Sequence, residues 1–252
     1  MPPVYENLFD FAYIPEFERL VRSLAQKSQQ ENWSYDPAQG DLNILKNYIS
    51  HTYKKIAGES KIAATANKAC FNTGLFAPSN NEIFWVFTKN ANANRQPWYS
   101  HGVYEASDII LSDFSTLPER ASYFTSHEEL IYDTNKELRI NAGHILDANR
   151  ENLERIPESV RDKPFLPTLL LGAVEDAKIK VRQNYRVAVP QYYNNAIQFL
   201  LPLCLTGRYV PDVALVVSRQ DNFYIGHTCL SLQMAYNNAR LIAKPMADWL
   251  LP

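Results

Sequence analysis

The stretch Val187-Ala188-Val189-Pro190-Gln191-Tyr192-Tyr193-Asn194-Asn195-Ala196-Ile197-Gln198-Phe199-Leu200 decides the fold class of this chain. Apolar segments at its two ends flank the Asn194-Asn195 pair, and asparagine tolerates the positive φ angles that a tight hairpin turn requires. We therefore predict an antiparallel hairpin here. Residues 213–217 and 223–225 flank a polar segment in the same way and predict a second hairpin.

Outward from these hairpins, apolar residues recur at helical spacing. We predict helices that begin near Pro15, Asp41, Asn141, Pro167 and Leu232. Asp41 is expected to cap its helix through its side chain. Strands are expected at residues 82–88 and 138–140.

Helices come early and hairpins late, without regular strand-helix-strand alternation. This order predicts an α+β fold in which an antiparallel sheet from the late hairpins packs against several helices. We expect residues 1–252 to form a single globular domain, with a subdomain split near residues 157–164 as the alternative.

The chain has 252 residues, of which 25 are Lys or Arg and 27 are Asp or Glu, for a formal net charge of -2. This balance excludes a strongly basic coat for nucleic acid, although a local basic patch remains compatible with it. No apolar run approaches the roughly 20 residues that span a bilayer, so we expect no membrane partner and no signal peptide. Three scattered cysteines are typical of a reducing compartment, and we expect a cytoplasmic protein.

Local signatures of catalysis are missing from the sequence: it contains no P-loop, dinucleotide-binding, zinc-hydrolase or serine-elbow motif. We therefore expect no cofactor and no metal, and any enzyme activity should be metal-independent. Polar residues inside apolar stretches are the remaining guide, because burying an amide without a partner costs roughly 1 to 3 kcal/mol. Four such places stand out.

The first place is Asn72-Thr73-Gly74, where amide and hydroxyl groups are expected to contact a ligand and the glycine lets it approach the backbone. The alternative is an ordinary Asx turn.

The second place comprises Arg139, Asn141 and His144. An anion is expected at the helix start, with His144 as general acid or base; the alternative is a structural cap.

The third place is the hairpin itself. Gln191 and Gln198 are expected to contact base edges, and Tyr192 or Tyr193 to stack on a base, since only one of the two can face a given side. The alternative is an edge hairpin with amphipathic tyrosines.

The fourth place runs from His227 into the predicted C-terminal helix. Asn237 and Arg240 are neighbours on that helix at spacing i, i+3, a pattern that suits phosphate or base binding. The alternative is that asparagines here hold adjacent backbone. Similarly, a basic stripe of Lys178, Arg182 and Arg186 is spaced at i, i+4 and i+8 on the predicted long helix. This stripe suits either a phosphate backbone or a solvated salt-bridged face.

Several segments resemble the domain-of-unknown-function 3825 family: Asn7-Leu8-Phe9-Asp10-Phe11-Ala12, Phe71-Asn72-Thr73-Gly74-Leu75, Leu117-Pro118-Glu119-Arg120-Ala121, Arg139-Ile140-Asn141 with His144, residues 197–205, and Met234-Ala235-Tyr236-Asn237-Asn238-Ala239-Arg240-Leu241. The resemblance covers essentially the whole chain, and the last segment is its most specific part. Domains of that family sometimes lie beside cold-shock or LOTUS-type RNA-binding modules. The resemblance therefore implies work on RNA or nucleotides. His227, Gln233 and Met246 depart from the residues common in that family, which puts a catalytic role for the last segment in doubt.

Two functional hypotheses follow. In the first, the protein is a metal-independent hydrolase of a nucleotide or RNA-end phosphate ester. Its proposed residues are His144 for proton transfer, Arg139 and Arg240 for phosphate charge, and Asn72, Thr73, Asn141 and Asn237 for orientation. In the second, it is a non-catalytic module that binds RNA or a nucleotide through stacked tyrosines, Tyr192, Tyr193 and Tyr224. The third hypothesis is that the protein is a scaffold that binds no ligand.

Overall fold

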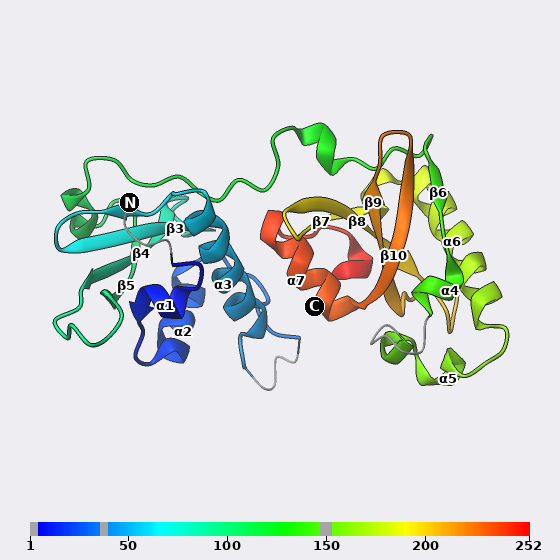
Figure 1. The fold of residues 1–252 in the computed structure, drawn as a ribbon, viewed down its shortest axis with the longest axis horizontal. Helices are drawn as coiled ribbons and strands as arrows, with labels where there is room; N and C mark the ends of the chain where they lie inside the picture. Colours follow the sequence, from blue (N-terminus) through cyan, green and yellow to red (C-terminus); the bar gives the residue numbers. More distant parts are fainter. Residues whose placement is uncertain (1–4, 36–39, 147–152) are drawn as a thin grey trace. The chain divides into compact units, whose positions relative to one another are not determined.

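The computed structural model describes residues 5–35, 40–146 and 153–252, which form two compact units, Met1–Ser122 and Tyr123–Pro252 (Figure 1). Each unit contains one five-stranded sheet that is mostly antiparallel. The α+β prediction is confirmed. The boundary falls after Ser122, so the connector at residues 157–164 lies inside the second unit. The expectation of a single domain stays a prediction.

The sheet of the first unit has the strand order β1-β5-β4-β3-β2. Its strands are β1 (Ala12–Tyr13), β2 (Ala63–Ala64), β3 (Lys68–Phe76), β4 (Glu82–Lys89) and β5 (Trp98–Glu105). β4 is central, as its doubly apolar sequence predicted, and β1 pairs in parallel with β5 at one edge. The helices are α1 (Leu8–Phe11), α2 (Phe17–Lys27) and α3 (Asn43–Gly58), with a 3-10 helix at Ile109–Asp113.

One face of this sheet is aromatic. Phe71, Trp85 and Phe87 stack on one another with ring centroids 5.8 to 6.2 Å apart, and Tyr53 from α3 meets Phe71 edge to face. Rings of this size bury large apolar areas, so this layer fixes α3 against β3 and β4.

The cap of α3 differs from the prediction. Leu42 is the N-cap residue, with a left-handed backbone and no side-chain cap bond. The Asp41 carboxylate instead accepts hydrogen bonds from Ser34 Oγ and from the backbone N–H of Asn43. Asp41 therefore closes the preceding loop, and the helix begins one residue later than an Asp41 cap would require.

The sheet of the second unit has the strand order β6-β10-β9-β8-β7. Its strands are β6 (Glu137–Arg139), β7 (Val189–Tyr193), β8 (Ala196–Leu203), β9 (Val213–Arg219) and β10 (Phe223–Ser231). The helices are α4 (Ala142–Ile145), α5 (Glu158–Arg161), α6 (Leu166–Gln183) and α7 (Leu232–Ile242). Short 3-10 helices lie at His127–Leu130, Leu153–Arg155, Tyr185–Val187 and Asp248–Leu250.

Both predicted hairpins are present. Asn194 and Asn195 join β7 to β8 with φ angles of 48° and 60°, as a tight turn between twisted strands requires. The prediction placed Val187 in the first strand, but it ends a 3-10 helix and β7 begins at Val189. α7 spans Leu232–Ile242, as predicted.

The two long helices of this unit cover opposite faces of its sheet. α6 packs in one apolar cluster with Phe199, Leu201, Leu215 and Val217. Side chains alternate along a strand, so residues 198, 200, 216 and 218 point to the other face. α7 lies there, because Asn238 on α7 bonds Gln191, the cross-strand partner of Gln198. None of the described helices is both long enough and apolar enough to span a membrane.

Candidate functional site

A row of polar residues crosses the α7 face of the second sheet at one level. The strand register makes Gln191 the partner of Gln198, Gln198 the partner of Ser218, Ser218 the partner of Ile225, and Ile225 the partner of Arg139. Directly opposed residues share a face, so all five side chains project to the same side. Four of the five are polar, and we call this set, residues 191, 198, 218, 225 and 139, the polar row.

The β7 end of the polar row is a chain of amides. The Asn238 amide donates to Gln191 Oε1 at 3.1 Å, and Gln191 Nε2 donates to Gln198 Oε1 at 3.0 Å. Gln191 is 1% exposed, whereas Gln198 is partly exposed. A buried amide must have its partners, and this network supplies them. Gln198 therefore lies between this amide network and the partly exposed middle of the row.

The middle of the row is a serine–histidine pair. Ser218 Oγ contacts Nε2 of His227, which projects from an irregularity of β10 between Gly226 and Thr228. Burial is the main cause that lowers the pKa of His227, and the charge of His144 lowers it further. Because a lowered pKa keeps the imidazole neutral at pH 7, Nε2 can accept the proton of the serine hydroxyl.

The β6 end of the row carries an exposed ion pair between Arg139 and Glu137. Arg139 lies over the ring of Phe223 at 3.8 Å from its centroid, and its Nε donates to Glu137 at 2.9 Å. Its side chain is 56% exposed, so solvent screens the ion pair. Stacking on Phe223 orients the guanidinium while leaving it accessible.

Asn141 and His144 lie beside this end of the row. Asn141 is the N-cap of α4, and its Oδ1 accepts the backbone N–H of His144 at 3.0 Å. α4 has only four residues, so its dipole is small, and the capping role accounts for Asn141. His144 is exposed and close enough for its charge to act on His227.

Tyr192 and Tyr224, two of the candidate base-stacking residues, are engaged within the fold. Tyr192 is 9% exposed, with its hydroxyl on Asn195 Oδ1 at 3.0 Å and its ring against Tyr123. Tyr224 is fully buried. Tyr193, in contrast, is 52% exposed. Of the three tyrosines, it alone offers a largely free ring.

Asn237 and Arg240 lie on α7, three residues apart as predicted. Asn237 is partly buried and Arg240 is only 8% exposed. Both have interaction partners, so neither is an unsatisfied buried group. Arg240 is too enclosed to attract a ligand from solvent without some rearrangement.

Asn72 and Thr73 belong to the first unit, where both are fully buried. Asn72 Oδ1 accepts the N–H of Gly74 at 2.9 Å, an Asx turn, and its amide donates to the carbonyl of Pro118 at 3.4 Å. Thr73 Oγ1 donates to the carbonyl of Ile83 at 2.7 Å. Gly74 is approached by the Tyr48 hydroxyl rather than by open space. The structural alternative accounts for this segment.

Sequence reasoning missed Ser218 and Phe223. Ser218 is the first polar residue after the apolar run at residues 213–217, on the face that alternation assigns to Gln198. That position was the available clue.

The basic stripe on α6 behaves as the salt-bridged alternative, because Lys178 pairs with Glu175 at 2.8 Å. Within the described residues, no group of three or more His, Cys, Asp or Glu side chains is arranged to hold a metal ion.

Two mostly antiparallel sheets, each with a parallel strand pair at an edge, define this chain as an α+β protein with a polar row on one sheet face. The family model described as "Domain of unknown function (DUF3825)" matches residues 24–249, and the chain belongs to that family. No curated protein and no solved structure gave a match.

Proposed function

We propose that this protein handles nucleotides or RNA: it binds a phosphate-bearing nucleotide or RNA end on the polar row and hydrolyses a phosphate ester there. The contact between Ser218 Oγ and His227 Nε2 carries the proposal, since it pairs a hydroxyl nucleophile with a neutral base. Arg139 adds accessible positive charge two strands away, about 10 Å from Ser218, a span comparable to one nucleotide.

The proposed reaction needs only groups of this chain and water. Ser218 Oγ attacks the phosphorus while His227 Nε2 takes the hydroxyl proton, and the bond to the leaving oxygen breaks as the imidazolium returns that proton. Water then attacks the phosphoserine while His227 Nε2 takes its proton. The bond between phosphorus and Ser218 Oγ breaks, the phosphate leaves, and the imidazolium returns the proton to Ser218 Oγ. Gln198 is placed to orient the ligand, and Arg139 to attract its charge. In this scheme the proton-transfer role first assigned to His144 passes to His227, and His144 acts only through its charge.

The first experiment incubates the protein with a panel of nucleotides and with capped, cyclic and linear RNA ends. On the substrate that is turned over, His227→Asn and Ser218→Ala should each lower kcat at least about 100-fold, because general base catalysis typically contributes that much. His127→Asn is the matched control, since His127 is an exposed histidine of the same unit outside the polar row.

The outcomes separate the candidate functions. If a nucleotide or RNA end binds through Arg139 and Gln198 but is never hydrolysed, the protein is a non-catalytic binding module and not a hydrolase. If no member of the panel binds, or if Ser218→Ala turns over at the wild-type rate, the proposal is overturned.

A pH prediction tests the electrostatics of the pair without a substrate. The pKa of His227 should be measured below the ordinary value of about 6.5 by NMR titration of its imidazole. His144→Asn should raise that pKa, because it removes a repelling positive charge. Since the folded pKa is depressed, the stability linked to His227 is present above about pH 6.5 and is lost as the pH falls through the folded value. A His227 pKa above 6.5 would contradict the assignment.

The proposal includes a cytoplasmic location. All three cysteines are free, with Cys70 and Cys229 buried and Cys204 partly buried. Unpaired thiols suit a reducing compartment.

A further inference from the structure

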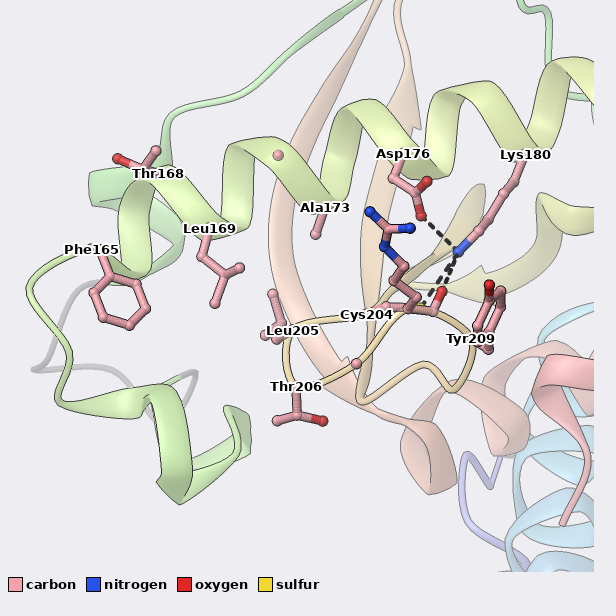
Figure 2. A pocket seen from close by; sticks show the side chains of 13 residues that line it. Phe165, Thr168, Leu169, Ala173, Asp176, Lys180, Cys204, Leu205, Thr206 and Tyr209 are labelled. Atoms are coloured by element: carbon pink, nitrogen blue, oxygen red, sulfur yellow. Dashed lines mark hydrogen bonds and ion pairs between the residues drawn. The ribbon is translucent and has the colours of Figure 1, made fainter.

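A groove of about 870 Å³ opens in the second unit between α6 and the loop that follows β8 (Figure 2). Its helix wall is a single stripe of α6, formed by residues three or four apart: Leu169, Gly172, Ala173, Asp176 and Lys180. The opposite wall is Cys204–Tyr209. The volume lies in the range of roughly 300 to 1,000 Å³ that small-molecule sites occupy.

The two ends of the groove differ in chemistry. Phe165, Leu169 and Ala173 lie along the apolar end, with Leu205 facing them from the loop (Figure 2). About 22 Å separates Phe165 from Lys180 along the helix axis, at 1.5 Å per residue. The groove is therefore long enough for an extended chain, and it changes from apolar to charged along its length.

The charged end has a net positive charge. Lys180 Nζ is held by the carboxylate of Asp176 at 2.7 Å, by Cys204 Sγ at 3.5 Å and by the carbonyl of Arg208 at 3.4 Å. These contacts use the three donors of the ammonium group. Within the described residues, the guanidinium of Arg208 makes no hydrogen bond or ion pair, so its charge is available to a ligand.

Gly172 is an independent sign that the groove stays open. It lies in the interior of α6, where glycine is less stable than alanine, and a Cβ added to it would meet no atom within 4 Å. Neither a turn nor a close backbone contact explains this glycine. Its missing side chain widens the groove at its middle.

We infer that this groove binds a small amphipathic anion, whose apolar chain lies along Leu169, Gly172 and Ala173 and whose anionic head meets Arg208. The positive charge at one end selects an anion, and the apolar stripe selects a chain rather than a compact ion. This site is separate from the polar row and does not depend on the proposed hydrolysis.

The rate at which a thiol reagent labels Cys204 measures ligand binding in the wild-type protein. It lines the groove, whereas Cys70 and Cys229 are buried, and burial raises the pKa of each of those thiols to about 12. N-ethylmaleimide at pH 7.5 should therefore label Cys204 alone, as peptide mass spectrometry would show. Decanoate should slow this labelling at least about 5-fold, and shortening to octanoate and hexanoate should weaken protection about 2- to 4-fold per CH₂.

Substitutions then identify which residues bind the anionic head and which bind the apolar chain of the ligand. Arg208→Gln should weaken decanoate binding, measured by calorimetry, about 10-fold. Lys163→Gln removes the same charge from an exposed site outside the groove and should leave it unchanged. Gly172→Leu should abolish protection by filling the groove. Gly172→Ala should keep most of the binding and raise the midpoint of thermal unfolding. The midpoint of Gly172→Leu should not fall below that of the wild type, which shows that the leucine effect is not loss of fold.

Each outcome decides the inference. Decyl phosphate binding in place of decanoate would keep the site and assign a phosphate head to it. Equal protection by 1-decanol would overturn the anionic assignment. Absence of protection by all the chain-bearing probes, or protection unchanged in Gly172→Leu, would overturn the site, and neither result would bear on turnover at Ser218 and His227.

Discussion

Replacing Tyr224 by alanine is expected to lower the free energy of unfolding of the second unit by about 4 kcal/mol, as loss of a buried aromatic ring does. Tyr224 is fully buried and stacks on Tyr132 with ring centroids 4.3 Å apart, and Phe199 meets it edge to face. Its hydroxyl also accepts the backbone N–H of Asp133 at 2.9 Å. Urea unfolding followed by circular dichroism measures the change.

Two other substitutions separate packing from hydrogen bonding at this site. Tyr224→Phe keeps the ring but leaves the Asp133 N–H without its acceptor, so a loss of about 1 to 2 kcal/mol is expected. Tyr193→Ala, at a half-exposed tyrosine in the same sheet, should lose less than about 1 kcal/mol. If Tyr224→Ala unfolds within 1 kcal/mol of the wild type, the ring does not hold this core together.

Gly74→Ala is expected to destabilise the first unit by about 3 kcal/mol. Gly74 has a φ of +75°, where a residue with a Cβ is strained by about 1 to 2 kcal/mol. The added Cβ would also lie 2.5 Å from the Tyr48 hydroxyl, which donates to the carbonyl of Thr73 at 3.0 Å. Chemical unfolding of the variant measures the sum of strain and clash.

A double-mutant cycle isolates the clash. Tyr48→Phe alone should lose about 1 kcal/mol with its hydrogen bond. In that background Gly74→Ala should destabilise by only about 1 to 2 kcal/mol, since the backbone strain remains and the hydroxyl is gone. Equal effects of Gly74→Ala in both backgrounds would show that the tyrosine does not require the glycine.

The elements that could be predicted depend on local chemistry. Asn194 and Asn195 form the β7–β8 turn because asparagine accepts positive φ, which neighbouring residues need not specify. α7 ends before Pro245 for an equally local reason, the missing N–H and fixed φ of proline. Asp41 shows the limit of such reasoning. Its carboxylate is suited to cap a helix, but it accepts a hydrogen bond from the hydroxyl of Ser34, seven residues earlier in the chain.

The candidate site could be predicted only in part. Gln191 and Gln198 follow from the hairpin register once the turn is known. Ser218 and His227 belong to a second hairpin whose irregularity at His227 rotates the histidine onto the face of Ser218, and a regular alternation does not predict that shift. Asn72 was expected to contact a ligand, but its own turn and a distant carbonyl satisfy it.

Sequence alone therefore determined the α+β class, the long helices, the two hairpins and the presence of polar residues within apolar strands. Tertiary structure decided which of those polar residues meet. Arg139 joins the polar row only because β6 pairs in parallel with β10, more than 80 residues later in the chain. Backbone torsion preferences and side-chain periodicity act over a few residues and can be identified from a short window. Pairing between distant strands depends instead on the burial and hydrogen bonding of the whole unit, which no short window contains.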